Sequence, residues 1–228
     1  MAPEIVDSFK VGTKTVVVAD CDLRGDITLG SGTILQPRCT ILAMAGPIVF
    51  GSNNIVEENV VIVNRLKQPM VIGDNNLFET GCRIESPCIG SHNTFGIRCR
   101  VTPMVEVGSN CVVGAGCIVQ ACPFPPEQPR TGADAEDRGP VAPASDELMP
   151  PPSSEGPSQT DPSPSPAPSS ATSQPPLDRL DDFTHVFGSE NRRRKASGEG
   201  SGQSKALFVK HWEYLRDTLP KYHKLKMF

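Results

Sequence analysis

The chain has 228 residues, 23 of them proline, and a net charge of −4 at pH 7. No segment has the basic balance that wrapping nucleic acid requires, and apolar runs such as residues 60–63 are far too short to span a bilayer. The first ten residues lack a basic start followed by an apolar run, so they predict no signal peptide. We therefore expect a soluble intracellular protein.

A six-residue repeat runs through residues 11–122. A period of six fits neither an amphipathic helix nor a half-buried strand. It fits a triangular coil built from three hexapeptides, in which the same register returns every eighteen residues and neighbouring coils lie about 4.8 Å apart. We predict an all-β fold, a left-handed parallel β-helix over residues 1–122. The repeated positions are Val11, Val17, Leu23, Leu29, Leu35 and Ile41, then Phe50, Val56 and Ile62, then Ile72, Phe78 and Ile84, then Ile89, Phe95, Val101, Val107, Val113 and Val119.

Corner phrases recur in the same register. Variants of Gly-(Asp/Ser)-x-Asn follow an inward aliphatic residue and begin at Gly51, Gly73 and Gly108. Glycine and asparagine both tolerate the positive φ of a tight turn. The phrases therefore indicate where each coil turns.

Seven cysteines each fall four residues after a repeated apolar residue, where a small inward side chain is wanted. A zinc site would need paired cysteines, and the near-pair Cys117 and Cys122 has no second pair to join it. The missing secretory signal disfavours disulfides. We interpret these residues as core positions: Cys21, Cys39, Cys82, Cys88, Cys99, Cys111 and Cys117.

Two excursions leave the repeat. Residues 65–69 are predicted to bulge out as a surface loop after Ile62. Residues 123–178 are acidic and rich in proline and serine, and they cannot bury enough apolar surface to offset their ordering entropy, so we expect a disordered insertion. Ser163 and Ser165 each precede a proline and are candidate phosphorylation sites, with an unmodified spacer as the alternative.

The repeat returns over residues 179–195, which we predict to form a closing coil of the β-helix. We interpret its basic end, Arg192 to Lys195, as a solvated charge run at the domain edge. A localisation signal and a basophilic kinase site at Ser197 are the alternatives. Residues 196–204 are expected to be a linker.

Residues 205–228 predict an amphipathic C-terminal helix, because Phe208, Trp212, Leu215, Leu219 and Tyr222 follow one another at spacings of three and four. Pro220 is expected to kink or interrupt it. A single exposed helix is marginal in water. This apolar face should therefore dock on the side of the β-helix or on a partner protein.

Hexapeptide β-helices are common among acyltransferases and γ-class carbonic anhydrases, and residues 23–26 resemble the Arg-Gly-Asp stretch of the second group. Such a metal site needs three histidines, but only His92 lies within the repeats. His92 occupies a corner phrase without an orienting carboxylate, so we interpret it as a solvent-facing turn residue. An acyltransferase base is the alternative. Arg24 and Asp26 are interpreted as a structural pair, and no catalytic, cofactor or metal residue is predicted.

Residues 23–28, 45–49 and 69–82 and the tail motif at 219–226 resemble the dynactin subunit 6 family of hexapeptide-repeat proteins. Generic hexapeptide similarity would not explain the tail motif. The proline-rich insertion departs from the family pattern, as does the short loop after Asn64.

This resemblance implies a non-catalytic scaffold or adaptor subunit of the dynactin pointed-end complex, supporting dynein-driven transport along microtubules in the cytoplasm. It implies dynactin subunit 5, a sibling β-helix, as the heterodimer partner, beside other pointed-end subunits. Dynein adaptors or cargo would attach indirectly. It implies no cofactor, no nucleic acid and no membrane insertion. The alternative is a homotrimeric enzyme, either an acyltransferase or a γ-carbonic-anhydrase-like protein.

Overall fold

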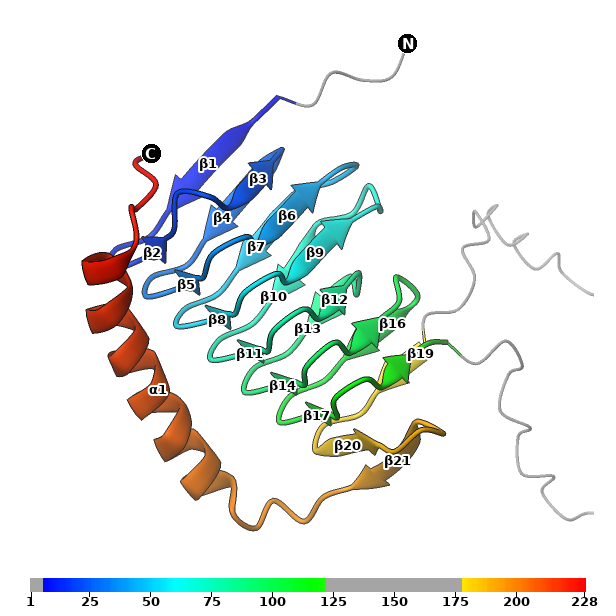
Figure 1. Ribbon diagram of the computed structural model, residues 1–228. Coiled ribbons are helices and arrows are strands. Elements are labelled where there is room, and N and C mark those ends of the chain that lie inside the picture. The colour runs from blue at the N-terminus through cyan, green and yellow to red at the C-terminus, as the bar shows by residue number, and fades with distance from the viewer. Residues whose placement is uncertain (1–5, 122–177) are drawn as a thin grey trace, which may run out of the picture. The chain divides into compact units, whose positions relative to one another are not determined.

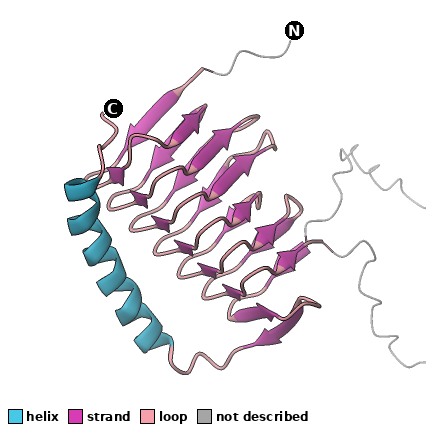
Figure 2. Ribbon diagram, viewed as in Figure 1, coloured by secondary structure: helices cyan, strands magenta, loops and turns pink. Residues whose placement is uncertain are grey.

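The computed structural model describes residues 6–121 and 178–228, which form three largely parallel β-sheets and one α-helix (Figures 1 and 2). Neighbouring strands of a sheet come from successive coils. Ser8 pairs with Asp26 and Leu23 with Ile41, each eighteen positions later. The predicted parallel β-helix is confirmed. The insertion at 123–177 and its candidate sites Ser163 and Ser165 lie outside the described residues.

Each of the three sheets follows one side of the coil. Sheet A contains β1 (Ser8–Val11), β4 (Asp26–Leu29), β7 (Ile48–Phe50), β10 (Met70–Ile72), β13 (Cys88–Ile89), β16 (Val105–Val107) and β19 (Asp178–Leu180). Sheet B contains β2 (Val16–Val17), β5 (Ile34–Leu35), β8 (Ile55–Val56), β11 (Leu77–Phe78), β14 (Thr94–Phe95), β17 (Val112–Val113), β20 (Thr184–Phe187) and β21 (Arg192–Lys195). Sheet C contains β3 (Asp22–Arg24), β6 (Thr40–Ala43), β9 (Val61–Asn64), β12 (Arg83–Ile84), β15 (Arg100–Val101) and β18 (Ile118–Val119).

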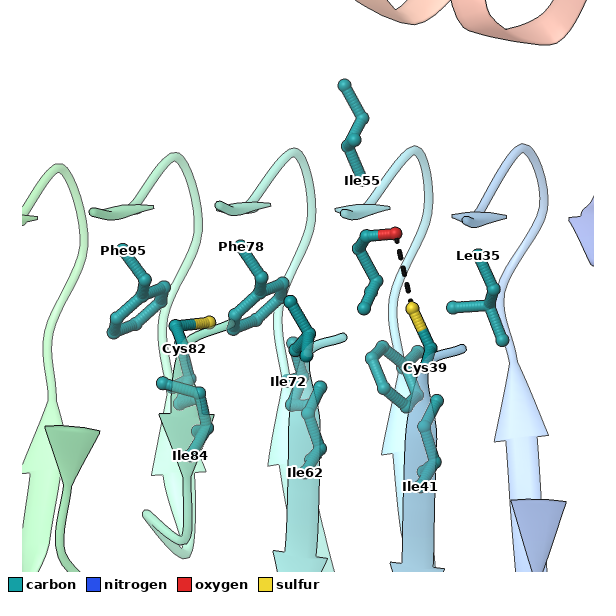
Figure 3. Close-up of a cluster of buried hydrophobic side chains, with 14 of the residues drawn as sticks. Leu35, Cys39, Ile41, Ile55, Ile62, Ile72, Phe78, Cys82, Ile84 and Phe95 are labelled. Atoms are coloured by element: carbon teal, nitrogen blue, oxygen red, sulfur yellow. Dashed lines mark hydrogen bonds between the residues drawn. The ribbon is translucent and has the colours of Figure 1, made fainter. Parts of the chain in front are cut away.

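The repeated apolar residues stack coil upon coil in the interior (Figure 3). Ile41, Ile62 and Ile84 form one such column along sheet C and have no exposed surface. In sheet B, the rings of Phe78 and Phe95 stack with their centroids 4.9 Å apart. Burial of this kind is the main favourable contribution to folding, so these columns hold the coils together.

The corner phrases turn as expected at asparagine but not at glycine. Asn53, Asn75 and Asn110 have φ of 55°, 56° and 56°. Gly51 is not among the residues with positive φ, but a Cβ on it would lie 2.8 Å from the backbone of Gly73 in the next coil. The glycine therefore permits close stacking of two coils, whereas the asparagine provides the turn.

Six of the seven predicted core cysteines are buried, but Cys88 is exposed. Its coil is one residue short, because Val71 pairs with Cys88 only seventeen positions later. Since neighbouring residues of a strand point to opposite faces, Ile89 takes the inward position and Cys88 points outward. The expectation for Cys88 was therefore wrong.

The buried thiol of Cys39 has a pKa above its ordinary value. The largest cause is its hydrogen bond with the Cys21 thiol, and burial is the second.

The last coil continues on both sides of the insertion, because β16 pairs with β19 and β17 with β20. This coil begins at Asp178, one residue earlier than predicted. Residues 192–195 are more than a charge run at the edge. They form β21, which pairs antiparallel with β20 and covers the outer edge of sheet B.

Helix α1 spans Ser201–Tyr222, so it begins four residues earlier and ends six residues earlier than predicted. Pro220 does not interrupt it, because the proline lies in the last turn, where only one hydrogen bond is lost. Residue His223 is extended, and the chain then runs back along the first coil. No helix in the described residues combines the length and the apolar character that crossing a membrane needs.

Candidate functional site

Helix α1 lies along sheet B, as Figure 1 shows, and contacts β2 and β5. The first residue of each short strand in this sheet points outward. Val16, Ile34 and Ile55 nevertheless expose only 7%, 0% and 0% of their surface. Figure 3 shows Ile55 directed away from the interior, toward the side where the helix runs. The outer face of sheet B is thus a second apolar layer, between sheet and helix.

The helix contributes the apolar face that its spacing predicts. Leu215 and Leu219 are buried, and Phe208 and Trp212 are partly buried against the same core. Tyr222 does not join them, since 78% of its surface is exposed. It is the last helical residue, and the chain leaves the helix there, so its ring has no coil beneath it.

Trp212 fixes the position of the helix along the sheet. Its indole Nε1 donates a hydrogen bond to the carbonyl of Gly32, with 2.6 Å between nitrogen and oxygen. Gly32 has a φ of 72°, and a Cβ on it would collide with Asn53 Oδ1 and lie 3.0 Å from the indole ring, so this corner favours glycine. The guanidinium of Arg216 lies 4.7 Å from the ring centroid on the indole face.

The C-terminal tail closes the first coil. Ala19 N donates to Lys224 O and Lys226 N donates to Val17 O, both at 2.8 Å. Leu225 thereby forms an antiparallel bridge with Val18 at the open edge of sheet B. An unpaired edge strand invites pairing with another chain. Within the described residues, β21 pairs with β20 at one end of sheet B and the tail forms a bridge with Val18 at the other, so the outer edge of β21 stays unpaired.

A cavity of about 380 Å³ lies where the first half of α1 faces the later coils. Its lining includes His92, His185, Lys205, Phe208 and Val112. His92 is exposed at a corner with φ of 61°, as predicted for a turn residue. Partial desolvation of its ring nevertheless lowers the pKa of His92, and the neighbouring Lys205 ammonium adds to this effect.

The remaining candidates for chemistry do not assemble. His211 lies on α1, with its Nε2 4.0 Å from Glu57 Oε1, and His223 is the C-cap residue of the helix. Among the described residues, no group of three or more histidine, cysteine or acidic side chains could hold a metal ion. Arg24 Nε lies 3.1 Å from Asp22 Oδ1, so Arg24 pairs with Asp22 rather than with Asp26. Asp22 and Arg24 belong to the same strand, β3, where residues two apart share one face, whereas Asp26 lies beyond the corner in β4.

An asparagine ladder runs up one corner and was not recognised in the sequence. The backbone N–H of Asn76 donates to Asn54 Oδ1 at 3.0 Å, and that of Asn93 donates to Asn76 Oδ1 at 2.9 Å. Cys111 N donates to Asn93 Oδ1 at 2.7 Å. The sequence did contain a sign of the ladder, because asparagine recurs at the fourth position of the corner phrases, as Asn54, Asn76 and Asn93. The ladder satisfies buried backbone groups and holds consecutive corners in register.

No helix among residues 6–121 and 178–228 covers the outer face of sheet A. Val49, Val71 and Cys88 are aligned on this face by strand pairing, and Val71 exposes 46% of its surface. A comparable aliphatic residue on sheet C is Ile118, which exposes 45%. Among the described residues, the outer faces of sheets A and C therefore carry exposed aliphatic side chains that a partner could contact.

Comparison with known proteins identifies relatives for this arrangement. The chain is 36% identical to dynactin subunit 6 of Danio rerio over 132 residues, covering 53% of this chain and 68% of the relative. It is 36% identical to dynactin subunit 6 of Nematostella vectensis over 130 residues, covering 52% of this chain and 71% of the relative. No family model matches the chain.

A solved structure shares the fold across most of the chain. It is a hexapeptide transferase family protein from Anaplasma phagocytophilum, with a TM-score of 0.60, 10% sequence identity, and coverage of 92% of this chain and 93% of that one. At such low identity the likeness concerns the fold alone. The identity to the two curated relatives extends over more than two thirds of each, and the chain therefore belongs to the dynactin subunit 6 family.

Proposed function

We propose that this protein is a non-catalytic scaffold subunit of dynactin, placed in the pointed-end complex, where it supports dynein-driven transport and the attachment of adaptors or cargo. The observation that carries the proposal is the similarity to dynactin subunit 6 from two animals over most of their length. Through the complex, the protein would be cytoplasmic and associated with microtubules.

The packing of the β-helix supports a scaffold role. Its interior is filled by residues such as Ile41, Ile62 and Phe78, each without exposed surface. A rigid unit with flat outer faces can act through those faces.

We further propose a sibling β-helix, dynactin subunit 5, as the direct partner. Because α1 lies over sheet B, sheets A and C are the faces that the described residues leave for this contact. Val71 and Ile118 are matched probes, since one lies on each face with nearly equal exposure. The enzyme alternative would instead require this chain to form a homotrimer by itself.

The test is affinity purification of the tagged chain from its native cells, with quantitative mass spectrometry of the captured proteins and light scattering of the purified chain. We expect dynactin subunits in near-equal amounts. Val71→Arg and Ile118→Arg should differ, with only the variant on the contact face losing the sibling β-helix. A stable homotrimer that captures no dynactin subunit would contradict the proposal and favour the enzyme.

A further inference from the structure

Ser197 follows a run of four basic residues, Arg192 to Lys195. Arg194, Arg193 and Arg192 stand three, four and five positions before the serine. Arginine binds carboxylates through two parallel hydrogen bonds, so a basic run at this spacing suits an enzyme with an acidic substrate cleft. Basophilic protein kinases have that chemistry.

The structure presents this segment in an accessible form. The four basic residues form β21, an edge strand of sheet B whose outer edge is not paired within the described residues. All four are exposed, as is Ser197. The serine lies outside β21 and just before Gly198, whose φ is 79°. A kinase cleft can therefore approach an extended backbone and an exposed hydroxyl.

A second serine shows what the structure adds to the motif. Ser86 also has an arginine three positions before it, Arg83. Ser86 is fully buried, and its hydroxyl donates to the carbonyl of Val105 at 2.6 Å. Arg83 is engaged with the buried carboxylate of Glu85 at 2.6 Å. Both serines follow an arginine at the same spacing, but a kinase can reach only Ser197, because Ser86 is buried.

The arginine nearest the serine is also the one most easily engaged. Arg192 pairs with Glu190 at 2.7 Å and Arg193 with Asp178 at 3.1 Å. Arg194 forms no ion pair with the described residues and lies 5.6 Å from the ring centroid of Phe187. An exposed cation–π contact contributes only about 0.5 to 1 kcal/mol. A carboxylate in a kinase cleft could displace it at little cost.

We propose that Ser197 is the phosphate acceptor for a basophilic protein kinase. In the reaction, Ser197 Oγ forms a bond to the γ-phosphorus of ATP, the bond from that phosphorus to the ADP oxygen breaks, and the hydroxyl proton passes to a carboxylate of the kinase. The product adds a charge of about −1.5 to −2. This charge lies shortly before α1, whose N-cap Gly200 provides no side-chain cap and whose first turn has no acid.

The test uses the full-length folded protein, ATP and the catalytic subunit of cyclic-AMP-dependent protein kinase, with phosphopeptide mapping. We expect about one phosphate per chain at Ser197. The Ser197→Ala variant should take up no phosphate at this position, whereas the Ser197→Thr variant should still be phosphorylated there. Arg194→Gln should lower the initial rate by about tenfold, since a charge-assisted hydrogen bond contributes roughly 1.5 kcal/mol or more. Arg192→Gln is the matched control, and circular dichroism confirms that each variant is folded.

Two results would rule out Ser197 as the acceptor, and a third would rule out recognition through Arg194. One is a folded protein that takes up no phosphate while a synthetic peptide of residues 190–199 does, because the structure would then shield the serine. The other is equal incorporation in the wild type and in Ser197→Ala. An Arg194→Gln variant phosphorylated at the wild-type rate would equally rule out the basophilic recognition.

Discussion

The interior of the β-helix and the outer face of sheet B are both apolar, yet their side chains are buried for different reasons. Ile62 is enclosed by the coils above and below it and by the other two sheets. Ile34 points outward and is enclosed because α1 lies over it. The first kind of burial repeats along the chain, whereas the second depends on a segment about 180 residues away.

This difference should appear in how each region responds to a loss of volume. A coil is hydrogen-bonded to a neighbour on each side, so the interior has little freedom to collapse around a cavity. The layer beneath α1 has one movable wall, since the helix is a single element joined by a linker and a tail. We therefore expect interior substitutions to destabilise more than substitutions in the helix layer.

The largest effect is expected for Phe78→Ala. Phe78 has no exposed surface and stacks on Phe95. Its truncation should lower the free energy of unfolding by about 3 to 5 kcal/mol, measured by urea denaturation. Leu207→Ala, on the exposed side of α1, should change it by less than about 0.5 kcal/mol. Equal effects for the two variants would show that the interior is not packed as described.

Leu215→Ala should have a smaller effect, about 2 to 3 kcal/mol, since the helix can adjust its position. Because the layer under α1 would loosen, the tryptophan emission of Trp212 should also shift to longer wavelength. Fluorescence and hydrogen exchange measure this directly. Tyr214→Ala is the control on the same helix, with 63% of Tyr214 exposed. A blue-shifted or unchanged emission for Leu215→Ala would contradict the docking of α1 on sheet B.

Asn76→Ala tests the asparagine ladder. The substitution removes the Nδ2 donor to Asn54 Oδ1, which still accepts from the backbone N–H of residue 76, and it leaves the buried backbone N–H of Asn93 without an acceptor. We expect a loss of about 1 to 3 kcal/mol in the free energy of unfolding. Asn75→Gly should be nearly neutral, because Asn75 has a φ of 56° that glycine adopts readily. If both variants had the stability of the wild type, the ladder would not contribute to folding.

The smallest effect is expected for Trp212→Phe. The variant keeps a ring against the sheet but loses the hydrogen bond to the carbonyl of Gly32. The substitution should lower the free energy of unfolding by about 0.5 to 1.5 kcal/mol and increase hydrogen exchange within α1. Thermal unfolding followed by circular dichroism is suitable, since the variant has no tryptophan. A loss larger than that of Leu215→Ala would mean that the hydrogen bond, rather than apolar burial, holds the helix.

The sequence predicted the interior well because each coil repeats the same local pattern. Ile41, Ile62 and Ile84 each lie six residues after an apolar residue of the same coil, and the turns at Asn53 and Asn75 follow from local backbone preferences. Cys88 was assigned to the wrong face because a single missing residue reverses the direction of the side chain. A repeat is reliable only as far as its spacing is unbroken.

The candidate surface was predicted in part, through the spacing of Phe208, Trp212, Leu215 and Leu219. That spacing showed which face of the helix is apolar but left open whether it docks on this chain or on a partner. Tyr222 fits the spacing equally well and is exposed. The spacing of apolar residues in a helix does not show where the surface on which the helix packs comes to an end.

The coil, its six-residue period and most of its inward columns can be predicted from the amino-acid sequence, because each depends on a local pattern that recurs at short intervals along the chain. The three-dimensional contacts were needed to show that α1 covers sheet B, that the tail and β21 pair with the two end strands of that sheet, and that Ser197 is exposed while Ser86 is buried. These features depend on contacts between distant segments, and such contacts leave no periodic trace along the chain.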